Sequence, residues 1–292
     1  MAVSPNEIEK TIHRFERAAE CSRNSTFRRG NIIDLDDSVD DVLVTTDLHG
    51  NRVNFRQLIE IADLSAHPHR HLVLQEVCHG GPIYPGTSGG CMSHLLLEDV
   101  AQLQCDHPDR VHFLFSNHEL AELTDFPITK SSRMLNLQFR TGMQHLYGSG
   151  SDRVRQAAMN FVLNSVLGVR LRNGVFICHS IPEALDVDPL DQRILERDLG
   201  EQDFAPGGDV FRLVWGRDFR ASNAEIFCEL VDAQVLIHGH EPCPHGFQTP
   251  NQRQVIIDCA GWNACYLLLT NRLPLTHADV VDLIRHLHGE PR

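Results

Sequence analysis

Several common features are missing from this sequence, and each absence excludes a class of protein. The nine cysteines include no C-x-x-C pair, and several, such as Cys178 and Cys259, lie inside or beside apolar runs. That placement is typical of buried, reduced thiols rather than of a disulfide framework or a zinc ribbon. Positive charge is also scarce: 26 Lys and Arg residues face 39 Asp and Glu residues, and the formal net charge is −13. Non-specific binding to nucleic acid or to anionic lipid needs a positive surface, so neither is expected.

The sequence also lacks any segment that would take the chain into or across a membrane. No apolar run approaches the roughly 18 residues that a membrane-spanning helix needs. Residues 1–20 carry charges throughout and lack the apolar core of a signal peptide. We therefore expect a soluble, cytoplasmic protein. Its 292 residues, of which 42% are hydrophobic, are enough to bury a sizeable core, and this composition excludes wholesale disorder.

Apolar periodicity predicts strands that alternate with helices in the first half of the chain. A polar helix over residues 5–20 and a charged loop over 21–40 come first. Short apolar runs and helical spacing then predict strands over 41–46, 71–77 and 111–115, and helices over 53–64 and 92–104. This alternation implies βαβ units.

The second half of the chain has a different pattern. A mostly helical region over 120–167, interrupted near Gly148, precedes strands with shorter connections, as in a meander. These strands are expected over 174–178, 234–237, 254–258 and 266–269. Together the two halves indicate an α/β sandwich whose strand ends carry the chemistry. The expected divisions are an N-terminal helix and loop extension at 1–40, a main domain at 41–272 and a C-terminal helix at 273–292.

Potential metal ligands follow most of the predicted strands. Asp47 and His49 lie two residues apart just after the first strand, so both can point at one ion. Taken alone, this pair is equally compatible with a helix N-cap aspartate beside a surface histidine. The later strand ends carry Asn117, His118, His179, His238 and His240. An asparagine oxygen can bind a metal, a histidine beside it can donate a proton, and the H-x-H spacing places two imidazoles on one face of an extended segment.

The order of these motifs resembles that of the calcineurin-like metallophosphoesterases, and specifically the phosphoprotein phosphatase branch. The matching blocks are Thr46–Gly50 (T-D-L-H-G), Ser116–Glu119 (S-N-H-E), His179–Ser180, Leu213–Arg217 with its tryptophan, and Gly239–His240. The resemblance covers roughly residues 41–270. It implies a four-layer α/β/β/α sandwich that holds two metal ions.

The resemblance also implies roles for individual residues. Asp47 and His49 would bind the first metal, and Asn117, His179 and His240 the second. In the broader superfamily, the two histidines of an H-x-H motif bind one metal each. By that pattern His238 would bind the second metal and His240 the first. His118 would protonate the leaving group. Mixed carboxylate, amide and imidazole ligands suit Mn²⁺, Fe or Zn²⁺, and of these we take Mn²⁺ first.

The second motif of the branch, G-D-x-x-D-R-G, is altered in this chain. Its bridging aspartate becomes Glu76, its paired aspartate becomes His79, and its arginine becomes Gly80. Glu76 could still bridge two metals. In the family, the paired aspartate orients the catalytic histidine that His118 matches, and no replacement for this aspartate is evident in the sequence. Arg217 and Arg220 are candidates for binding the substrate phosphate, since a guanidinium matches phosphate oxygens in a bidentate way. They are equally compatible with solvated surface residues.

The predicted function is metal-dependent hydrolysis of a phosphoester by a hydroxide held between two divalent metals. The expected substrate is a phosphoprotein or a small phosphoester, as for a serine/threonine protein phosphatase. Hydrolysis of dinucleoside polyphosphates is the alternative activity. A non-catalytic, metal-binding relative with a regulatory role is the alternative class, and the altered second motif motivates it. The region 120–170, which contains Arg133, Arg140, Arg153 and Arg155, is a candidate cover over the site.

Overall fold

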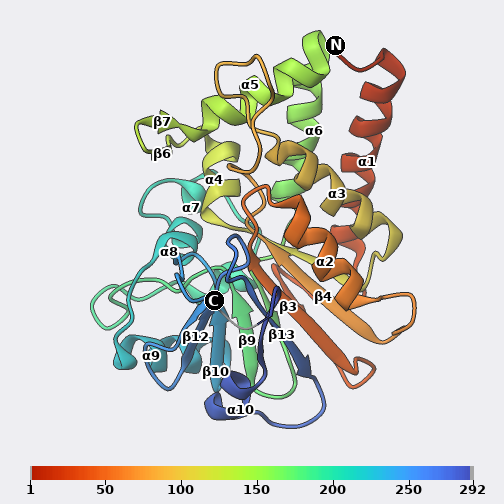
Figure 1. The fold of residues 1–292 in the computed structure, drawn as a ribbon. Helices are drawn as coiled ribbons and strands as arrows, with labels where there is room; N and C mark the ends of the chain where they lie inside the picture. Colours follow the sequence, from red (N-terminus) through yellow and green to blue (C-terminus); the bar gives the residue numbers. More distant parts are fainter. Residues whose placement is uncertain (1, 290–292) are drawn as a thin grey trace.

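Two β-sheets form the centre of the computed structural model, which describes residues 2–289. Figure 1 shows their strands between helices on either side. The seven-stranded sheet has the order β1 (Arg28–Arg29), β2 (Ile32–Asp34), β8 (Gly168–Arg170), β9 (Val175–Cys178), β10 (Val235–His238), β12 (Gln254–Ile257) and β11 (Phe247–Gln248). The five-stranded sheet has the order β14 (Ile284–His286), β13 (Cys265–Thr270), β3 (Asp41–Asp47), β4 (Arg70–Gln75) and β5 (Val111–Leu114). A separate hairpin joins β6 (Thr129–Lys130) to β7 (Arg133–Met134).

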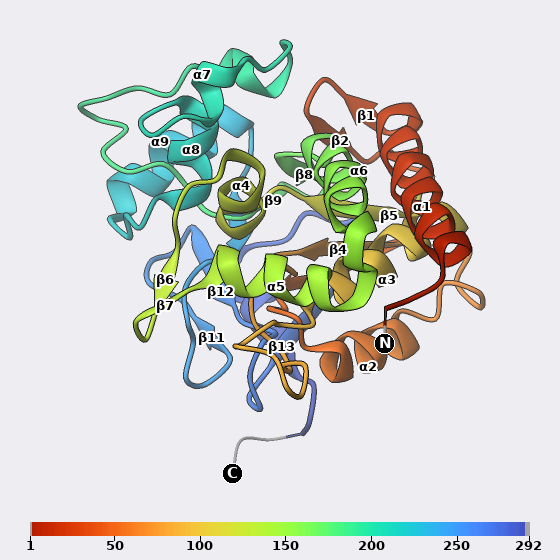
Figure 2. The same ribbon diagram turned by 90° about the horizontal axis from the view of Figure 1, so that it is seen from above.

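Helices cover the outer faces of both sheets. The α-helices are α1 (Pro5–Asn24), α2 (Arg52–Ala62), α3 (Ser93–Asp106), α4 (Asn117–Thr124), α5 (Leu135–Tyr147), α6 (Ser151–Leu163), α7 (Glu201–Phe204), α8 (Asp209–Trp215), α9 (Ala221–Val231) and α10 (His277–Asp282). Short 3₁₀ turns occupy Gly148–Gly150 and Gln192–Leu195. Seen from above, α1 runs beside α3 and α6 (Figure 2). The result is the expected layering of helix, sheet, sheet and helix.

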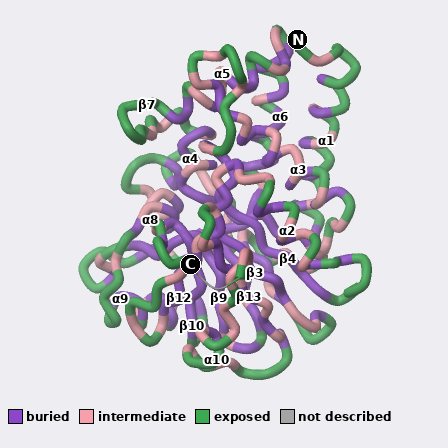
Figure 3. The backbone as a smooth tube through the Cα atoms, viewed as in Figure 1, coloured by how far each residue is buried: buried purple, intermediate pink, exposed green. Residues whose placement is uncertain are grey.

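Alternate residues of the strands feed two different cores. On β9, Val175 and Ile177 pack in the cluster between the sheets, whereas Phe176 packs in the cluster under the helices. The ring of Phe176 meets Phe227 of α9 edge-on, at 6.3 Å between centroids. This period-two pattern follows from the pleat of a strand. Consequently the strands that carry the polar ends are buried on both faces, as the purple central tube in Figure 3 shows.

The structure corrects several expectations for the elements. The segment 21–40 is not only loop, because β2 lies in it and pairs in parallel with β8. The second half is not a meander: β9, β10 and β12 run parallel, with α8 and α9 in the connection between the first two. The predicted C-terminal helix over 273–292 is helical only in α10 and then continues as β14, while residues 290–292 lie outside the described part. The domain boundaries themselves stay a prediction.

Other sequence expectations concern cysteines and membranes. All nine cysteines are free, and eight of them are buried. Within residues 2–289, no helix combines the length and apolar character that crossing a membrane would require.

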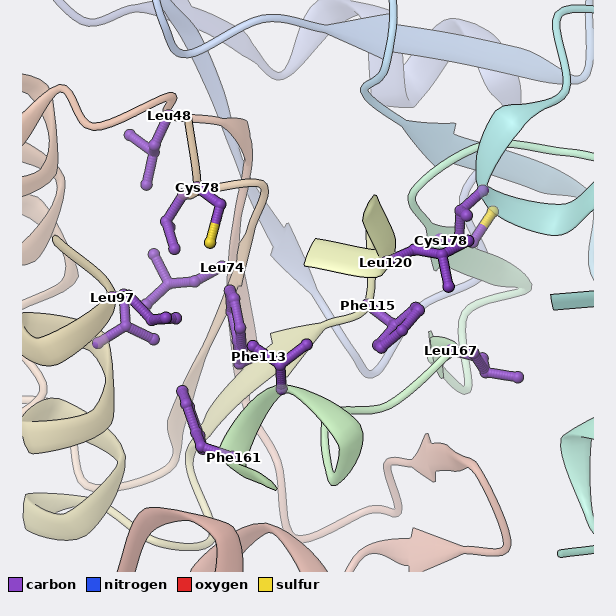
Figure 4. Close-up of a cluster of buried hydrophobic side chains, with 14 of the residues drawn as sticks. Leu48, Leu74, Cys78, Leu97, Phe113, Phe115, Leu120, Phe161, Leu167 and Cys178 are labelled. Atoms are coloured by element: carbon purple, nitrogen blue, oxygen red, sulfur yellow. The ribbon is translucent and has the colours of Figure 1, made fainter. Parts of the chain in front are cut away.

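We expect substitution of Phe113 by alanine to destabilise the fold strongly. Phe113 on β5 is 1% exposed and stacks on Phe161 of α6, with ring centroids 5.4 Å apart (Figure 4). Removing a buried aromatic ring typically costs about 3–5 kcal/mol of unfolding free energy. Urea-induced unfolding would measure this loss. The control, Val187→Ala, removes a side chain that is 81% exposed, and equal midpoints for the two variants would contradict the prediction.

Candidate metal centre

The candidate site lies where the carboxyl ends of five strands from both sheets meet. The strands β3, β4 and β5 run parallel in one sheet, and β9 and β10 run parallel in the other. Each strand ends in or is followed by a polar side chain, namely Asp47, Glu76, Asn117, His179 and His240. Parallel strands present their carboxyl ends at the same edge of a sheet. Side chains that are far apart in the sequence therefore become neighbours here.

Strained backbone follows several of these strand ends. His49, Glu76, His79 and His240 all have positive φ, at 42°, 46°, 63° and 71°. A non-glycine residue in this region costs about 1–3 kcal/mol and persists only where its surroundings hold it. Glu119 supplies part of that restraint, because its Oε1 accepts hydrogen bonds from the backbone N–H groups of Val77 and Cys78, at 3.0 and 2.8 Å.

One group of polar atoms surrounds Asn117. Its Oδ1 lies 2.8 Å from His179 Nε2 and 3.1 Å from His240 Nδ1, and these two nitrogens are 3.2 Å apart. The Nδ1–H of His179 donates to Gln75 Oε1 at 2.8 Å, so its Nε2 carries a lone pair. This lone pair faces the amide oxygen of Asn117.

A second group of polar atoms lies on the other side of Glu76. His49 Nε2 is 3.9 Å from Glu76 Oε2, and His118 Nε2 is 3.5 Å from Glu76 Oε1. His49 donates its Nδ1–H to the carbonyl of His79 at 3.1 Å, which leaves its Nε2 free for a ligand. Asp47 Oδ1 accepts the backbone N–H of His240 at 3.0 Å, and so joins the two groups.

Residues of these two groups form two sets that could each hold a divalent metal ion, and Glu76 belongs to both sets. His49, Glu76 and His118 form one set of three ligand-type residues, and Glu76, His179 and His240 form another. Within residues 2–289, Glu76 Oε2 is buried and has no hydrogen-bond partner. Acceptor atoms that face one another at hydrogen-bond distance repel unless a cation or a proton lies between them. Glu76 is thus common to both sets of ligand-type residues.

The electrostatics of the carboxylates point the same way. Burial raises the pKa of Asp47 to about 7. Burial together with the neighbouring charge of Asp47 raises the pKa of Glu76 well above its usual range. Two buried carboxylates so close to each other cannot both be ionised without positive charge nearby. Metal cations bound here would supply that charge, whereas without them the two carboxyl groups share a proton.

Burial also favours the neutral form of His49, His179 and His240, which is the form that binds metals. It lowers the pKa of His240 to about 3, and it lowers the pKa of His179 well below the usual range. Burial lowers the pKa of His49. The hydrogen bond to the carbonyl of Cys78 opposes this shift, and the charge of Lys130 adds to it. Lys130 lies on the β6–β7 hairpin, and sequence reasoning did not single it out.

Three of the candidate residues lie outside the two groups. His238 Nε2 is 3.1 Å from Gln254 Nε2 on β12. It does not share a face with His240, because β10 ends at His238 and the chain turns at the positive φ of His240. Arg220 is held by Asp186 and Asp218, with closest contacts of 2.9 and 2.6 Å.

Arg217 is near enough to the site for its charge to act on His240. Its charge contributes, after burial, to the lowered pKa of His240. Its guanidinium also pairs with Glu241, and 44% of the side chain is exposed. Arg217 therefore stays a candidate for binding a substrate phosphate, which would have to compete with Glu241 for the guanidinium.

Comparison with solved structures places the fold. The chain is similar to a protein serine/threonine phosphatase from Saccharomyces cerevisiae with similarity to human phosphatase PP5. The match covers 98% of this chain and 90% of that one, at a TM-score of 0.72 and 12% sequence identity. The fold of this chain is therefore that of the yeast serine/threonine phosphatase structure. A cold-active protein-tyrosine phosphatase of a psychrophilic Shewanella species also matches, at a TM-score of 0.58 and 13% identity, over 86% of this chain and 80% of that one. No protein-family model and no curated protein matches the sequence.

We expect Gly239→Ala to disrupt the candidate metal centre. A Cβ added at Gly239 would lie 2.1 Å from Asp47 Oδ1 and 2.9 Å from Thr46 Cβ. The carboxylate must then move away from the backbone of His240. Calorimetric titration with Mn²⁺ should show binding weakened by about 10-fold or more. Gly261→Ala is the matched control, since nothing lies within 4 Å of its added Cβ. Similar affinities for the two variants would count against the assigned position of Asp47.

We also expect Gln75 to control metal affinity without binding the metal. Its Nε2 donates to the carbonyl of Thr45 at 3.3 Å, which directs its Oε1 toward His179 Nδ1. Such a partner fixes the tautomer of a ligating histidine, and its loss typically costs about 10–100-fold in metal affinity. Gln75→Leu should show this loss in the same titration, whereas Gln75→Glu keeps the acceptor. Wild-type affinity in the leucine variant would contradict the prediction.

Proposed function

We propose that this protein is a metal-dependent phosphoester hydrolase, and specifically a phosphomonoesterase of the serine/threonine protein phosphatase type. The observation that carries the proposal is the pair of ligand groups that share Glu76. The similarity in fold to a serine/threonine phosphatase supports it. The altered second motif weighs less against activity than the sequence alone suggests, because Glu76 lies between the two groups despite its longer side chain.

The residues have distinct roles in this proposal. Asp47 and His49 would hold one divalent ion, and Asn117, His179 and His240 would hold the other, while Glu76 belongs to both ligand groups. When bound, the ions polarise phosphoryl oxygens and lower the pKa of a water molecule. Mn²⁺ is the first candidate, and Fe or Zn²⁺ would suit the same mixed ligands.

His118 and Arg217 would act on the substrate. The Nε2 of His118 points toward Glu76 and would donate a proton to the leaving alkoxide, a contribution of about 10²–10⁴-fold in rate. Arg217 would contact phosphate oxygens after release from Glu241.

Hydrolysis of p-nitrophenyl phosphate with added Mn²⁺ tests the proposal. The wild type should be active, and Asp47→Asn should be inactive, because the amide removes a charge that holds the metal. Asp203→Asn is a matched control, since Asp203 is also a buried aspartate but pairs with Arg197 outside both ligand groups. Activity retained in Asp47→Asn would refute the assigned metal centre.

Metal analysis separates the enzyme from its non-catalytic rival. Two ions per chain agree with the enzyme. An inactive wild type with one ion or none would instead support a binding protein that keeps the fold.

A further inference from the structure

A chain of three side chains leads away from the candidate metal centre. His118 Nδ1 lies 3.0 Å from His79 Nδ1, and His79 Nε2 lies 3.4 Å from Glu122 Oε2. His118 and Glu122 are four residues apart on α4, so they share one face of the helix. His79 comes from the altered second motif and lies between them.

Glu122 is anchored from behind by two arginines. The Nε atoms of Arg140 on α5 and Arg155 on α6 both donate to Glu122 Oε1, at 2.9 and 2.7 Å. The other oxygen, Oε2, is thereby left for His79. Burial alone would raise the pKa of Glu122, but hydrogen bonds from His79 and from both arginines lower it overall. A charged carboxylate with no exposed side-chain surface therefore stands behind the histidine pair.

This arrangement determines the tautomers of both histidines. The Glu122 carboxylate only accepts, so His79 donates its Nε2–H and its Nδ1 carries the lone pair. His118 must then donate its own Nδ1–H to His79, and its Nε2 is turned toward Glu76. Both hydrogen bonds of this chain are therefore donated in the same direction, from His118 to His79 and from His79 to Glu122.

The surroundings of His79 are built to hold it in place. Its backbone is strained, with φ at 63°, and its N–H donates to Ser93 Oγ at 3.0 Å. Its ring meets Phe139 edge-on, with centroids 5.7 Å apart. Strain kept at a buried polar residue is typical of a functional constraint.

We propose that His79 and Glu122 act together as positioning residues for His118, replacing the single carboxylate that the altered motif lacks. This inference rests on the proposed function. Through His79, the Glu122 carboxylate holds the His118 ring so that the proton on Nε2 is turned toward the candidate site. That proton passes from Nε2 to the leaving oxygen as the P–O bond breaks, and His118 is left neutral with its Nδ1–H still bonded to His79.

The variant Glu122→Gln tests the proposal by reversing one hydrogen bond without changing shape. The amide oxygen stays with Arg140 and Arg155, so the amide N–H₂ faces His79 Nε2. His79 must then donate from Nδ1, and His118 loses its Nδ1–H tautomer. Nitrogen NMR of Zn²⁺-loaded protein labelled at histidine should show this change of tautomer at His118.

Kinetics supply the second readout. A proton donor matters for phenyl phosphate, whose leaving group is basic, and much less for p-nitrophenyl phosphate. Glu122→Gln should therefore slow phenyl phosphate hydrolysis by about 10-fold more than p-nitrophenyl phosphate hydrolysis, with metal content unchanged. A merely structural role would slow both reactions equally. Glu98→Gln is the matched control, because Glu98 is a partly buried carboxylate that binds Arg14 and Tyr147.

Each outcome decides the proposal. The tautomer change together with selective loss on phenyl phosphate supports it. An unchanged His118 tautomer, or equal loss on both esters, overturns it. Loss of one metal ion also overturns it, since His118 would then be a metal ligand. If the wild type hydrolyses neither ester, the proposed function fails, and the NMR result alone decides whether Glu122 orients His118.

Discussion

Two buried carboxylates, Asp47 and Glu76, lie together where the sheets converge, and the rest of the site is arranged around them. Burial raises the pKa of both, so their ionised forms depend on positive charge in the same small volume. The surrounding imidazoles cannot supply it, because burial keeps His179 and His240 neutral. The site is thus balanced electrically either when a proton stays on the carboxyl pair or when bound cations replace that proton. This requirement explains why several possible metal-ligand atoms lie together here although some of them, such as Glu76 Oε2, have no hydrogen-bond partner among the described residues.

The fold holds this unfavourable cluster in place by rigid means. The ligands follow strands that are buried on both faces, and the strained residues just beyond the strands are held by hydrogen bonds from neighbouring loops. Glu119 holds the loop after β4, and the backbone of Glu76 in turn accepts the N–H groups of Leu48 and His49 at 2.9 Å. The loop after β3 is therefore tied to the loop after β4.

Local sequence patterns predicted much of the site but little of its support. The strands before Asp47, Asn117 and His179 are short apolar runs, and each is followed by a polar motif, so both could be identified from neighbouring residues. The partner of His118 could not, because it depends on contacts between distant segments. Glu122 is positioned by Arg155, 33 residues away, and no local pattern reports such a pair. The sequence also did not predict that β9 and β10 run parallel. That prediction needs the helices α8 and α9 between them, and these helices are short with weak amphipathic patterns.

The hydrogen bond from the backbone of His240 to Asp47 has a consequence for how the molecule forms. It joins residues 193 positions apart, and it links one sheet to the other. Contacts of such sequence separation close late in folding, because the chain loses much conformational entropy before they give any stabilisation. The candidate metal centre is therefore complete only when both sheets have docked. Bound ions would in turn favour the docked state over every partly folded one, so cellular metal supply would act on the abundance of this protein as well as on its chemistry.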